Sequence, residues 1–488
     1  MNRVLVCAVL AGVVGFSSCK KVGFYTKSDA ALEFSESLIA FDTVFTSVNT
    51  ITRVLRVKNP YKENIKTDIM LVGGATSYFS LNIDGVSLDN AARLLKDVEI
   101  PAKDSIFIFI KANINPNGVN NPMLACDTVA FTTNGNRQNV ELLACGQDAH
   151  FILPKDTIIR VLGKDSFLII CNVVAAKGQS VTWKNDKPYV IYDYAFVDSD
   201  AKLTIEKGTR IYLHKGGTLL VWLDGCLEVN GTKDEPVTFQ GDRLESWYSN
   251  VHGQWDRIWF CESNKDSKID YAIIKNASFG IHAETLGDLR KNNKLTLTNT
   301  VIKNAQIGLL AKTYTIEASN NVFYDCTESC VALMQGGDYA FVNNTIYNRY
   351  TRRNLPSLYL SNYFTYNKGI KGKEYTLFSD FSGTFVNNII YGAFKNEFDC
   401  DSEKKAVFSA SFENCLLKID SLNILEKITH TNTLLGKNPA FVEEKDYKNL
   451  NLRDTSPCKK AGKPIPWLQT DIEGKARSSA YPSIGAYE

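Results

Sequence analysis

The sequence has few of the residues on which metal and acid–base chemistry depend. It holds 5 His and 4 Met in 488 residues. No His lies at zinc-like spacing from the close pair Cys326 and Cys330. Local Ser/His/Asp signatures and Gly-rich phosphate-binding motifs are absent too. We therefore expect no metal site and no cofactor, and we assign no catalytic residue.

Charge imbalance and long apolar segments are also missing. The 55 Lys and Arg nearly balance the 53 Asp and Glu, and a net charge of +2 argues against a nucleic-acid partner. After the first nineteen residues, no apolar run approaches the ~20 residues that span a bilayer. We expect the rest of the chain to be water-soluble.

The residues that are abundant favour β-structure. The chain has 22 Tyr and 26 Phe, and aromatic side chains suit a pleated, half-buried surface. No segment combines a 3.6-residue apolar period with helix caps. A chain of 488 residues is long enough for more than one domain of ~100–200 residues. The sequence therefore predicts an all-β protein of two domains.

The first nineteen residues have the order of an export signal. A positive charge precedes an apolar run over 4–14, and small residues precede Cys19. Phe16-Ser-Ser-Cys19 resembles the lipobox of bacterial lipoproteins, although that family more often has Leu where Phe16 stands. The resemblance implies a signal peptide over 1–19, lipid attachment at Cys19 and a tether over 20–31. It places the protein in the bacterial cell envelope, at the outer membrane, on either face. The alternative is an ordinary signal peptide with an incidental cysteine.

Residues 32–150 break into short β-rich runs separated by turn residues. The clearest runs are 43–48, 52–57, 105–110, 128–133 and 140–144. Several short strands with turns between them are typical of a β-sandwich. We expect an immunoglobulin-like β-sandwich that serves as a spacer or binding module. One run is apolar on both faces, Ile106 to Ile110, and this suits a central strand.

One pair of cysteines in this region has a suggestive spacing. Cys126 and Cys145 lie almost symmetrically about the turn Asn134-Gly135-Asn136, so a hairpin would bring them nearly opposite each other. They are either a disulfide, which an exported protein can form, or two small buried hydrophobic side chains.

Residues 151–488 carry a repeat in which an Asn precedes an apolar residue by three positions, with one degenerate copy, before Ile274, that has Tyr271 in place of the Asn. The apolar residues of six copies are Ile274, Ile302, Phe323, Ile346, Ile390 and Leu417, at spacings of 28, 21, 23, 44 and 27 residues. A variable period in the twenties is typical of a solenoid whose loops differ in length. Asn residues at one turn of successive coils can hydrogen-bond along the stack. The pattern predicts a right-handed parallel β-helix.

The same region resembles a known group of proteins. The motifs are Leu203-Thr-Ile-Glu-Lys-Gly-Thr209, Gly253–Phe260, the Asn repeats, and the ending Asp471–Arg477 with Ile484–Glu488. They look like bacterial right-handed β-helix repeat proteins of the pectate-lyase-like superfold. The resemblance implies a β-helix over 151–488 that ends in a cap, behind a β-rich front domain. It implies no activity, because fold alone does not give function.

An outward column of side chains follows from the repeat. If the six apolar residues point inward, the next residue of each copy points outward. These residues are Lys275, Lys303, Tyr324, Tyr347, Tyr391 and Lys418. Tyrosines flanked by lysines suit an anionic glycan, with rings against sugar faces and ammonium groups near carboxylates. The other interpretation is that Tyr and Lys are simply common on exposed strands.

Two insertions add candidates for glycan binding. One contains Trp247 and Trp255, and a longer one over 349–375 contains Arg352 and Arg353. Loops on a rigid scaffold often carry binding sites. An aromatic loop can equally cap the coil and cover apolar surface.

These features favour a lipid-anchored envelope protein that binds polysaccharide or another envelope polymer. The alternatives are a polysaccharide lyase or glycoside hydrolase, and a structural or adhesin component. His282 with Glu284, and Asp256 with Arg257, are spaced for pairing, but isolated polar residues in strands are more often surface groups. We therefore expect binding without established catalysis, with the membrane as a second partner.

Overall fold

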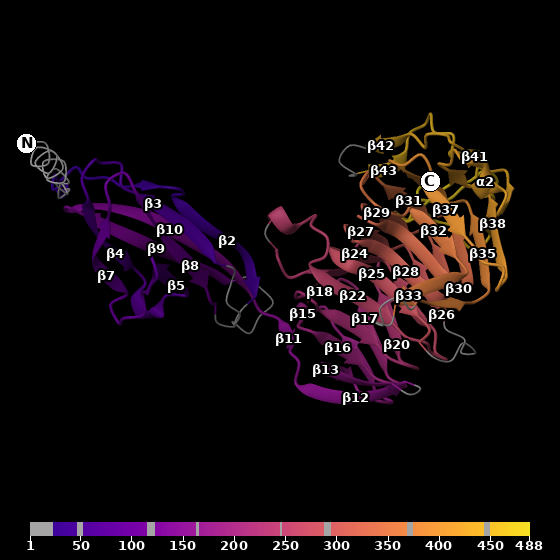
Figure 1. Cartoon of the computed structure of the whole chain (residues 1–488), viewed down its shortest axis with the longest axis horizontal. Helices are drawn as coiled ribbons and strands as arrows, with labels where there is room; N and C mark the ends of the chain where they lie inside the picture. Colours follow the sequence, from indigo (N-terminus) through magenta and orange to yellow (C-terminus); the bar gives the residue numbers. More distant parts are fainter. Residues whose placement is uncertain are drawn as a thin grey trace, which may run out of the picture. The chain divides into compact units, whose positions relative to one another are not determined.

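The structure is a computed structural model that describes residues 23–45, 52–114, 123–162, 165–244, 246–286, 294–367, 374–443 and 449–488. Strands dominate it, and the chain divides into two compact units, Met1–Asp148 and Ala149–Glu488 (Figure 1). Across these ranges, no helix has both the length and the apolar character that a membrane span needs. Cys19 lies outside the described residues, so lipid attachment there stays a prediction.

The first unit consists of two five-stranded sheets that share one hydrophobic core. One sheet has the order β1 (Glu33–Phe34), β3 (Arg53–Lys58), β8 (Ser105–Ala112), β5 (Phe79–Ile83) and β6 (Val86–Ser87). The other has the order β2 (Leu38–Phe45), β10 (Asn136–Gln147), β9 (Met123–Thr133), β4 (Ile65–Leu71) and β7 (Leu94–Ile100). A short turn of 3-10 helix, η2 (Gly74–Thr76), follows β4.

Strand β8 lies in the middle of its sheet, so the predicted central position is confirmed. Its residues alternate, with Ile106, Ile108 and Ile110 in the core and Phe107 and Phe109 exposed. Period-two alternation therefore buries only one apolar face of this strand.

The predicted hairpin joins β9 to β10, and its register offsets the two cysteines. Cys126 pairs with Leu143 rather than with Cys145. Cys126 is a free, exposed thiol. Neither a disulfide nor a buried hydrophobic position fits Cys126, so both interpretations were wrong for this residue. The side chain of Cys145 lies outside the described residues.

The second unit contains two large sheets, and nearly all of their strands are parallel. The 11-stranded sheet has the order β11 (His150–Ile152), β15 (Tyr189–Ile191), β18 (Arg210–Leu213), β21 (Val237–Gly241), β24 (Ala272–Lys275), β27 (Val301–Lys303), β29 (Val322–Tyr324), β31 (Thr345–Asn348), β36 (Ile389–Gly392), β39 (Leu416–Leu417) and β41 (Leu434–Leu435). We call it ladder C.

The 18-stranded sheet starts with the antiparallel hairpin of β12 (Asp156–Leu162) and β13 (Asp165–Ala175) and then forms two parallel ladders. Ladder A contains β13, β16 (Tyr194–Val197), β19 (Thr218–Val221), β22 (Trp255–Phe260), β25 (Ala277–Glu284), β32 (Leu358–Ser361) and β37 (Phe398–Asp401). Ladder B contains β14 (Ser180–Trp183), β17 (Lys202–Glu206), β20 (Cys226–Asn230), β23 (Ser267–Asp270), β26 (Lys294–Thr298), β35 (Phe381–Val386), β38 (Phe408–Glu413) and β40 (Thr429–Thr431). The long strands β28 (Ile307–Ser319) and β30 (Ser329–Val342) pass from ladder A into ladder B.

Inward side chains of the three ladders meet in one core. Ile258 of ladder A, Leu297 of ladder B and Ile274 of ladder C belong to the same buried cluster. Smaller elements lie outside the ladders. They are η3 (Ser246–Tyr248), the hairpin β33 (Tyr363–Asn367) and β34 (Glu374–Phe378), α2 (Leu422–Leu425), and the hairpin β42 (Phe441–Glu443) and β43 (Asn449–Leu452).

The predicted repeat is confirmed residue by residue. Its six apolar positions pair one above the next along ladder C, from Ile274 to Leu417, and all six are buried. The 44-residue interval contains β32 of ladder A and β35 of ladder B, with the extra hairpin of β33 and β34 between them. The spacing of apolar residues in the sequence therefore located successive strands of ladder C, although loops of unequal length separate them.

Asparagine side chains do bond along the stack, at two neighbouring positions. At the first position the backbone is left-handed, with φ of 56° at Asn320 and 54° at Asn343, which Asn tolerates. At the second position the amide oxygen of Asn344 accepts from the backbone N–H of Asn321 at 2.9 Å. Asn344 in turn donates its N–H to the amide oxygen of Asn388 at 2.9 Å. These bonds satisfy buried backbone N–H groups of the turns, which form no hydrogen bond within a strand ladder.

Asp325 has a left-handed backbone, as Asn304 has at the equivalent place of the preceding coil, while Asn348 of the next coil lies within β31. Burial raises the pKa of this carboxyl to about 6, although Arg349 and Lys303 lower it, and one carboxyl oxygen has no hydrogen-bond partner. An unfolded Asp titrates near ~4. The folded state therefore keeps a proton that the unfolded chain releases, and stability falls as the pH rises from about 4 through 6.

We predict that Asp325→Asn is more stable than the parent above pH 6, by roughly 1–3 kcal/mol, because it removes the cost of burying a charge. The two proteins should unfold at the same denaturant concentration near pH 4. Denaturation midpoints measured from pH 4 to 8 check this. A parent that gains stability over this interval relative to the variant contradicts it.

Candidate functional site

The predicted tyrosine column exists as a geometric feature. Lys275, Lys303, Tyr324, Tyr347 and Tyr391 pair in succession on ladder C. The rings of Tyr347 and Tyr391 stack at 6.3 Å, and the Lys303 ammonium lies 5.5 Å from the Tyr324 ring. Side-chain alternation along the strands thus aligned these residues as expected.

The column is covered by the C-terminal part of the chain. Tyr347 is only 7% exposed and meets the Phe441 ring edge-on at 5.5 Å. Tyr324 and Tyr391 are half-buried and pack against the same cluster, which includes Leu450, Ile484 and other C-terminal residues. The prediction that Tyr347 belongs to an open glycan-binding strip is therefore wrong. Its side chain points away from the ladder core, but the C-terminal residues pack over it.

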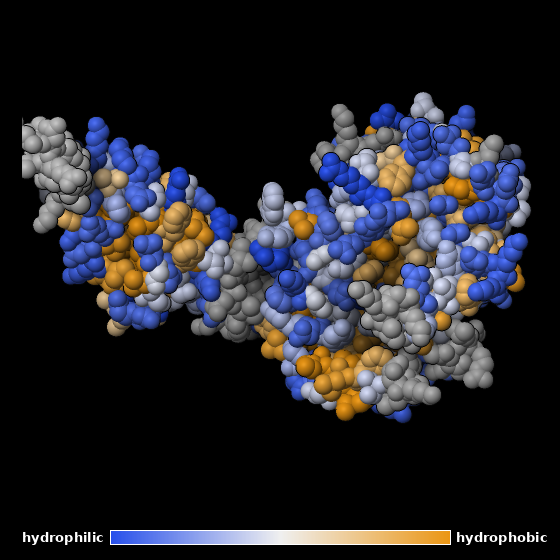
Figure 2. Space-filling view, viewed as in Figure 1, coloured by the Kyte–Doolittle hydropathy of each residue, from blue (hydrophilic) through white to orange (hydrophobic). Residues whose placement is uncertain are grey.

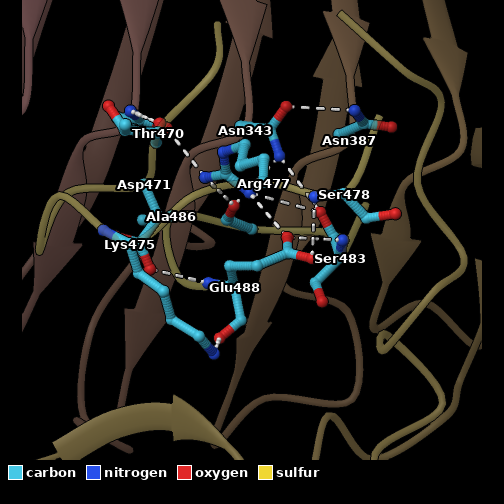
Figure 3. Close-up of polar contacts among 12 residues, drawn as sticks. Asn343, Asn387, Thr470, Asp471, Lys475, Arg477, Ser478, Ser483, Ala486 and Glu488 are labelled. Carbon is cyan, nitrogen blue, oxygen red and sulfur yellow. Dashed lines mark hydrogen bonds and ion pairs between the residues drawn. The ribbon is translucent and has the colours of Figure 1, made fainter. Parts of the chain in front are cut away.

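Polar contacts fix that C-terminal cover to the turns of the coils (Figure 3). Asn343 donates to the carbonyl groups of Ser483 and Gly485, each at 3.1 Å. Arg477 donates to the amide oxygen of Asn320 at 2.8 Å and lies 3.5 Å from the Glu488 carboxylate. The C-terminal motifs Asp471–Arg477 and Ile484–Glu488 therefore bind to the asparagine turns through Arg477 and Gly485.

The other predicted glycan contacts do not form one surface. Trp255 is fully buried and donates to the carbonyl of Lys275 at 2.8 Å, so it cannot touch a ligand. Arg353 is also buried, in an ion pair with Glu397. Arg352 and Trp247 are exposed. Burial and the neighbouring Lys303 lower the pKa of Lys275.

A connected series of polar and charged side chains lies on the outer face of ladder A instead. Asp256 accepts two bonds from the guanidinium of Arg257, at 2.8 and 3.0 Å. Arg257 donates to Nδ1 of His282 at 2.8 Å. Nε2 of His282 lies 3.4 Å from a carboxylate oxygen of Glu284, and Lys312 lies 3.3 Å from the same oxygen. We call these five residues the polar chain.

Strand register places the polar chain. Arg257 pairs with Phe279, His282 pairs with Trp259, and Glu284 pairs with Lys312. Adjacent parallel strands stack these residues on one face, although 56 positions separate Asp256 from Lys312 in the sequence. Without the strand register, the sequence predicts local pairs such as Asp256 and Arg257, but it does not predict that all five residues of the polar chain lie together.

Arg257 determines the state of His282. A guanidinium has only donors, so Nδ1 of His282 must accept and the ring proton sits on Nε2, facing Glu284. The His282 side chain is only 4% exposed. Burial lowers the pKa of His282, and Lys312 and Arg257 add to this effect against the opposing charge of Glu284. The imidazole is therefore neutral at pH 7.

Glu284 is held as a carboxylate. Burial alone would raise its pKa, but contacts with His282 and Lys312 overcome that effect and bring the pKa to about 2. A carboxyl with so low a pKa is a poor proton donor at neutral pH. The polar chain therefore offers fixed charges rather than a reserve of protons.

Aromatic rings border the polar chain. The Arg257 guanidinium lies 4.3 Å from the Phe279 ring and 5.4 Å from the Trp259 ring. The Lys312 ammonium lies 4.4 Å from the ring of Phe364, which β33 supplies from the long insertion. Part of that insertion therefore reaches the site, through a residue that the sequence did not single out.

No family model matches this chain, and no curated protein is similar to it. Among solved structures, a family 123 glycoside hydrolase from Clostridium perfringens, described for glycolipid glycan hydrolysis, aligns at 6% identity with a TM-score of 0.18. The alignment covers 32% of this chain and 30% of the hydrolase. A similarity this low carries no argument about fold or activity.

The part of the chain that the structure describes contains no candidate metal site. No three His, Cys, Asp or Glu residues converge there in a way that could hold a metal ion. Cys326 and Cys330 are buried in the core.

Proposed function

We propose that this protein is a lipid-anchored β-helix protein of the bacterial envelope that binds an anionic polysaccharide on the outer face of ladder A. In this proposal residues 151–488 form a right-handed parallel β-helix, and residues 32–150 form an immunoglobulin-like sandwich. Three stacked parallel ladders around one core support the first assignment. Two five-stranded sheets around one core support the second.

The observation that carries the proposal is the placement of two cations among aromatic rings. Arg257 lies close to the rings of both Trp259 and Phe279, and Lys312 lies against Phe364. Ring faces can stack on sugars, and a guanidinium can bind a carboxylate with two parallel bonds. This surface moves the binding role from the covered tyrosine column of ladder C to ladder A.

The state of the acids favours binding over glycoside hydrolysis. A hydrolase needs one carboxyl that stays protonated near neutral pH. Glu284 has the opposite property, and Asp256 is engaged by both the ε-nitrogen and one terminal nitrogen of Arg257. Neither residue is arranged as a general acid.

A polysaccharide lyase is the second candidate, because His282 is kept neutral. If a substrate carboxylate drew Arg257 away, Nδ1 of His282 would be free to accept a proton while Glu284 held the other side of the ring. Elimination would then move a proton from a sugar carbon to Nδ1 of His282, form a C=C bond and break the C–O bond to the leaving sugar, whose oxygen would take the proton back from the imidazolium. The specific observation behind this candidate is the Arg257 bond to Nδ1.

A panel of polysaccharides tests both candidates together. The protein is mixed with alginate, polygalacturonate and neutral glucans, and each mixture is assayed for binding, for ultraviolet absorbance of unsaturated ends and for new reducing ends. We expect salt-sensitive binding to the two anionic polymers. Unsaturated products would favour the lyase, and absence of binding to every polymer would contradict the proposal.

The lipid anchor has its own test. We predict that Cys19→Ser moves the protein from the membrane fraction to the soluble fraction of a bacterial host, because an acylated cysteine holds the chain through buried acyl groups. Fractionation followed by immunoblotting gives the answer. Membrane association of the variant equal to that of the parent would refute lipid attachment at this residue.

A further inference from the structure

A separate pocket lies beside the polar chain, between the hairpin of β12 and β13 and the outer face of ladder A. It encloses about 510 Å³. The hairpin supplies residues 167–170, and ladder A supplies Leu220, Trp222 and Trp259 among others. Asp193 is the one charged residue among the described residues that line it. A pocket of this size can enclose much of a small ligand, and its wall is apolar.

The hairpin is fixed in place as the roof of this pocket. Ile158 and Ile169 pack on the cluster that contains Phe196 and Trp222. Arg160 lies 2.6 Å from the carboxylate of Asp198, and its guanidinium lies 5.3 Å from the Phe196 ring. These contacts hold the roof over ladder A, so the pocket is part of the fold rather than an accident of loop placement.

The wall chemistry is unsuited to a sugar. Each hydroxyl buried without a hydrogen bond costs roughly 1–3 kcal/mol. Among the described lining residues, polar side-chain groups come from Asp193, Tyr194 and the indole N–H groups of Trp222 and Trp259, whereas residues 167–170, Leu220 and Leu286 offer none. An acyl chain has no such requirement. Most of the pocket wall is therefore complementary to a hydrocarbon.

One end of the pocket adjoins the polar chain. The ring of Trp259 lines the pocket, stacks on His282 at 5.7 Å and lies 5.4 Å from the Arg257 guanidinium. A ligand with its chain in the pocket would place a polar head near Arg257. The arrangement thus fits an amphiphile rather than a plain hydrocarbon.

Apolar side chains of the hairpin are also open to solvent at the rim of the pocket, and two of them, Leu168 and Ile170, line the pocket itself. Ile159, Leu168 and Ile170 are 65%, 66% and 58% exposed. Figure 2 shows apolar side chains gathered over β12 and β13. Contiguous exposed apolar surface usually has a binding role, and a rim of this kind suits transfer of an acyl chain from a micelle or membrane into the pocket.

We propose that this pocket binds the acyl chain of an amphiphile whose polar head lies toward Arg257. The inference goes beyond polysaccharide binding, which needs no apolar cavity. The ligand is a lipid rather than a protein partner or a second copy of this chain, because the hollow between the hairpin and ladder A, about 510 Å³ and mostly apolar, has the size and chemistry of a site for an acyl chain.

Dodecanoate and 12-bromododecanoate, both kept below their micelle concentrations, are suitable probes. Calorimetry with the first should show saturable binding of one molecule per chain. The second should quench tryptophan fluorescence, since its bromine, at the end of the chain away from the head group, would lie inside the pocket that Trp222 lines. No saturable binding, or quenching that rises without saturation, would overturn the proposal.

Two matched variants localise the effect. Ile170→Asp places a charge in the pocket wall, and Ile159→Asp places one on the same hairpin outside the pocket; both side chains are largely exposed, so the fold should tolerate either change. We expect at least a tenfold loss of dodecanoate affinity for Ile170→Asp and less than twofold for Ile159→Asp. Equal losses would indicate adsorption on the hairpin surface, and lipid binding that tracks self-association in gel filtration would indicate a second copy. Either result contradicts the proposal.

Polysaccharide binding by Ile170→Asp separates this proposal from the proposed function. Polymer affinity should stay unchanged while dodecanoate affinity falls. If the parent binds lipid but no polysaccharide, the lipid-binding proposal is supported and the proposed polysaccharide-binding function is contradicted.

Discussion

Replacing Arg353 by Met should destabilise the second unit by about 3–5 kcal/mol, because it leaves a buried carboxylate without its partner. The side chains of Arg353 and Glu397 are both 0% exposed. Glu397 also accepts bonds from the backbone N–H groups of Phe394 and Ser357. Arg353 donates to the carbonyl groups of Tyr350 and Leu355 at 2.8 and 2.6 Å. The pair thus ties the long insertion to the end of ladder A.

The neighbouring Arg352 supplies a matched control. It is exposed, so Arg352→Met should change the free energy of unfolding by less than about 0.5 kcal/mol. Arg353→Met combined with Glu397→Gln should cost less than the sum of the two single changes, since the double variant leaves no unpaired charge. Urea denaturation of the four variants measures these differences. Equal effects at positions 352 and 353 would show that the buried pair contributes nothing.

Asn344→Ala should cost about 3–4 kcal/mol, because one amide serves three levels of the stack. Its oxygen accepts two bonds from Asn321, and its nitrogen donates to the carbonyl of Ala318 and to the Asn388 amide oxygen. All three asparagines are fully buried. Each polar group left without a partner in such a place costs roughly 1–3 kcal/mol.

Asn354 provides the comparison for this variant. It is exposed, and its side chain reaches only the carboxylate of Glu328, at 3.2 Å. Asn354→Ala should therefore lower stability by less than about 0.5 kcal/mol. Denaturant titrations of both variants decide the point. A cost below 1 kcal/mol for Asn344→Ala would mean that the turns do not depend on the asparagine stack.

The sequence predicted the core of the second unit well because that core repeats. Each coil needs an apolar residue at the same place, so Ile302 and Ile390 could be aligned although loops of different length separate the copies. Side-chain alternation then placed Tyr347 on the outward side correctly. The C-terminal cover over Tyr347 was missed, because nothing local in residues 441–486 indicates which face of the coil they pack against.

The candidate site was harder to predict, because its parts come from separate strands. His282 and Glu284 share a strand, and their spacing gave the pair. Lys312 and Trp259 join them only through the register of ladder A. Trp255 and Trp259 look alike in the sequence, yet one fills the core and the other lies at the surface of the polar chain. The strand register shifts between Arg257 and Ile258, and this irregularity contributes to the different orientations of the two tryptophans.

The central claim is that ladder A, and not the tyrosine column of ladder C, binds an anionic polysaccharide. The most direct test is calorimetric titration of polygalacturonate into the parent, Arg257→Gln and Lys303→Gln. The account predicts at least a tenfold loss of affinity for Arg257→Gln, since a charge-assisted bond to a carboxylate contributes roughly 1.5–3 kcal/mol. It predicts less than a twofold change for Lys303→Gln. The reverse order, or equal losses for the two variants, would contradict it.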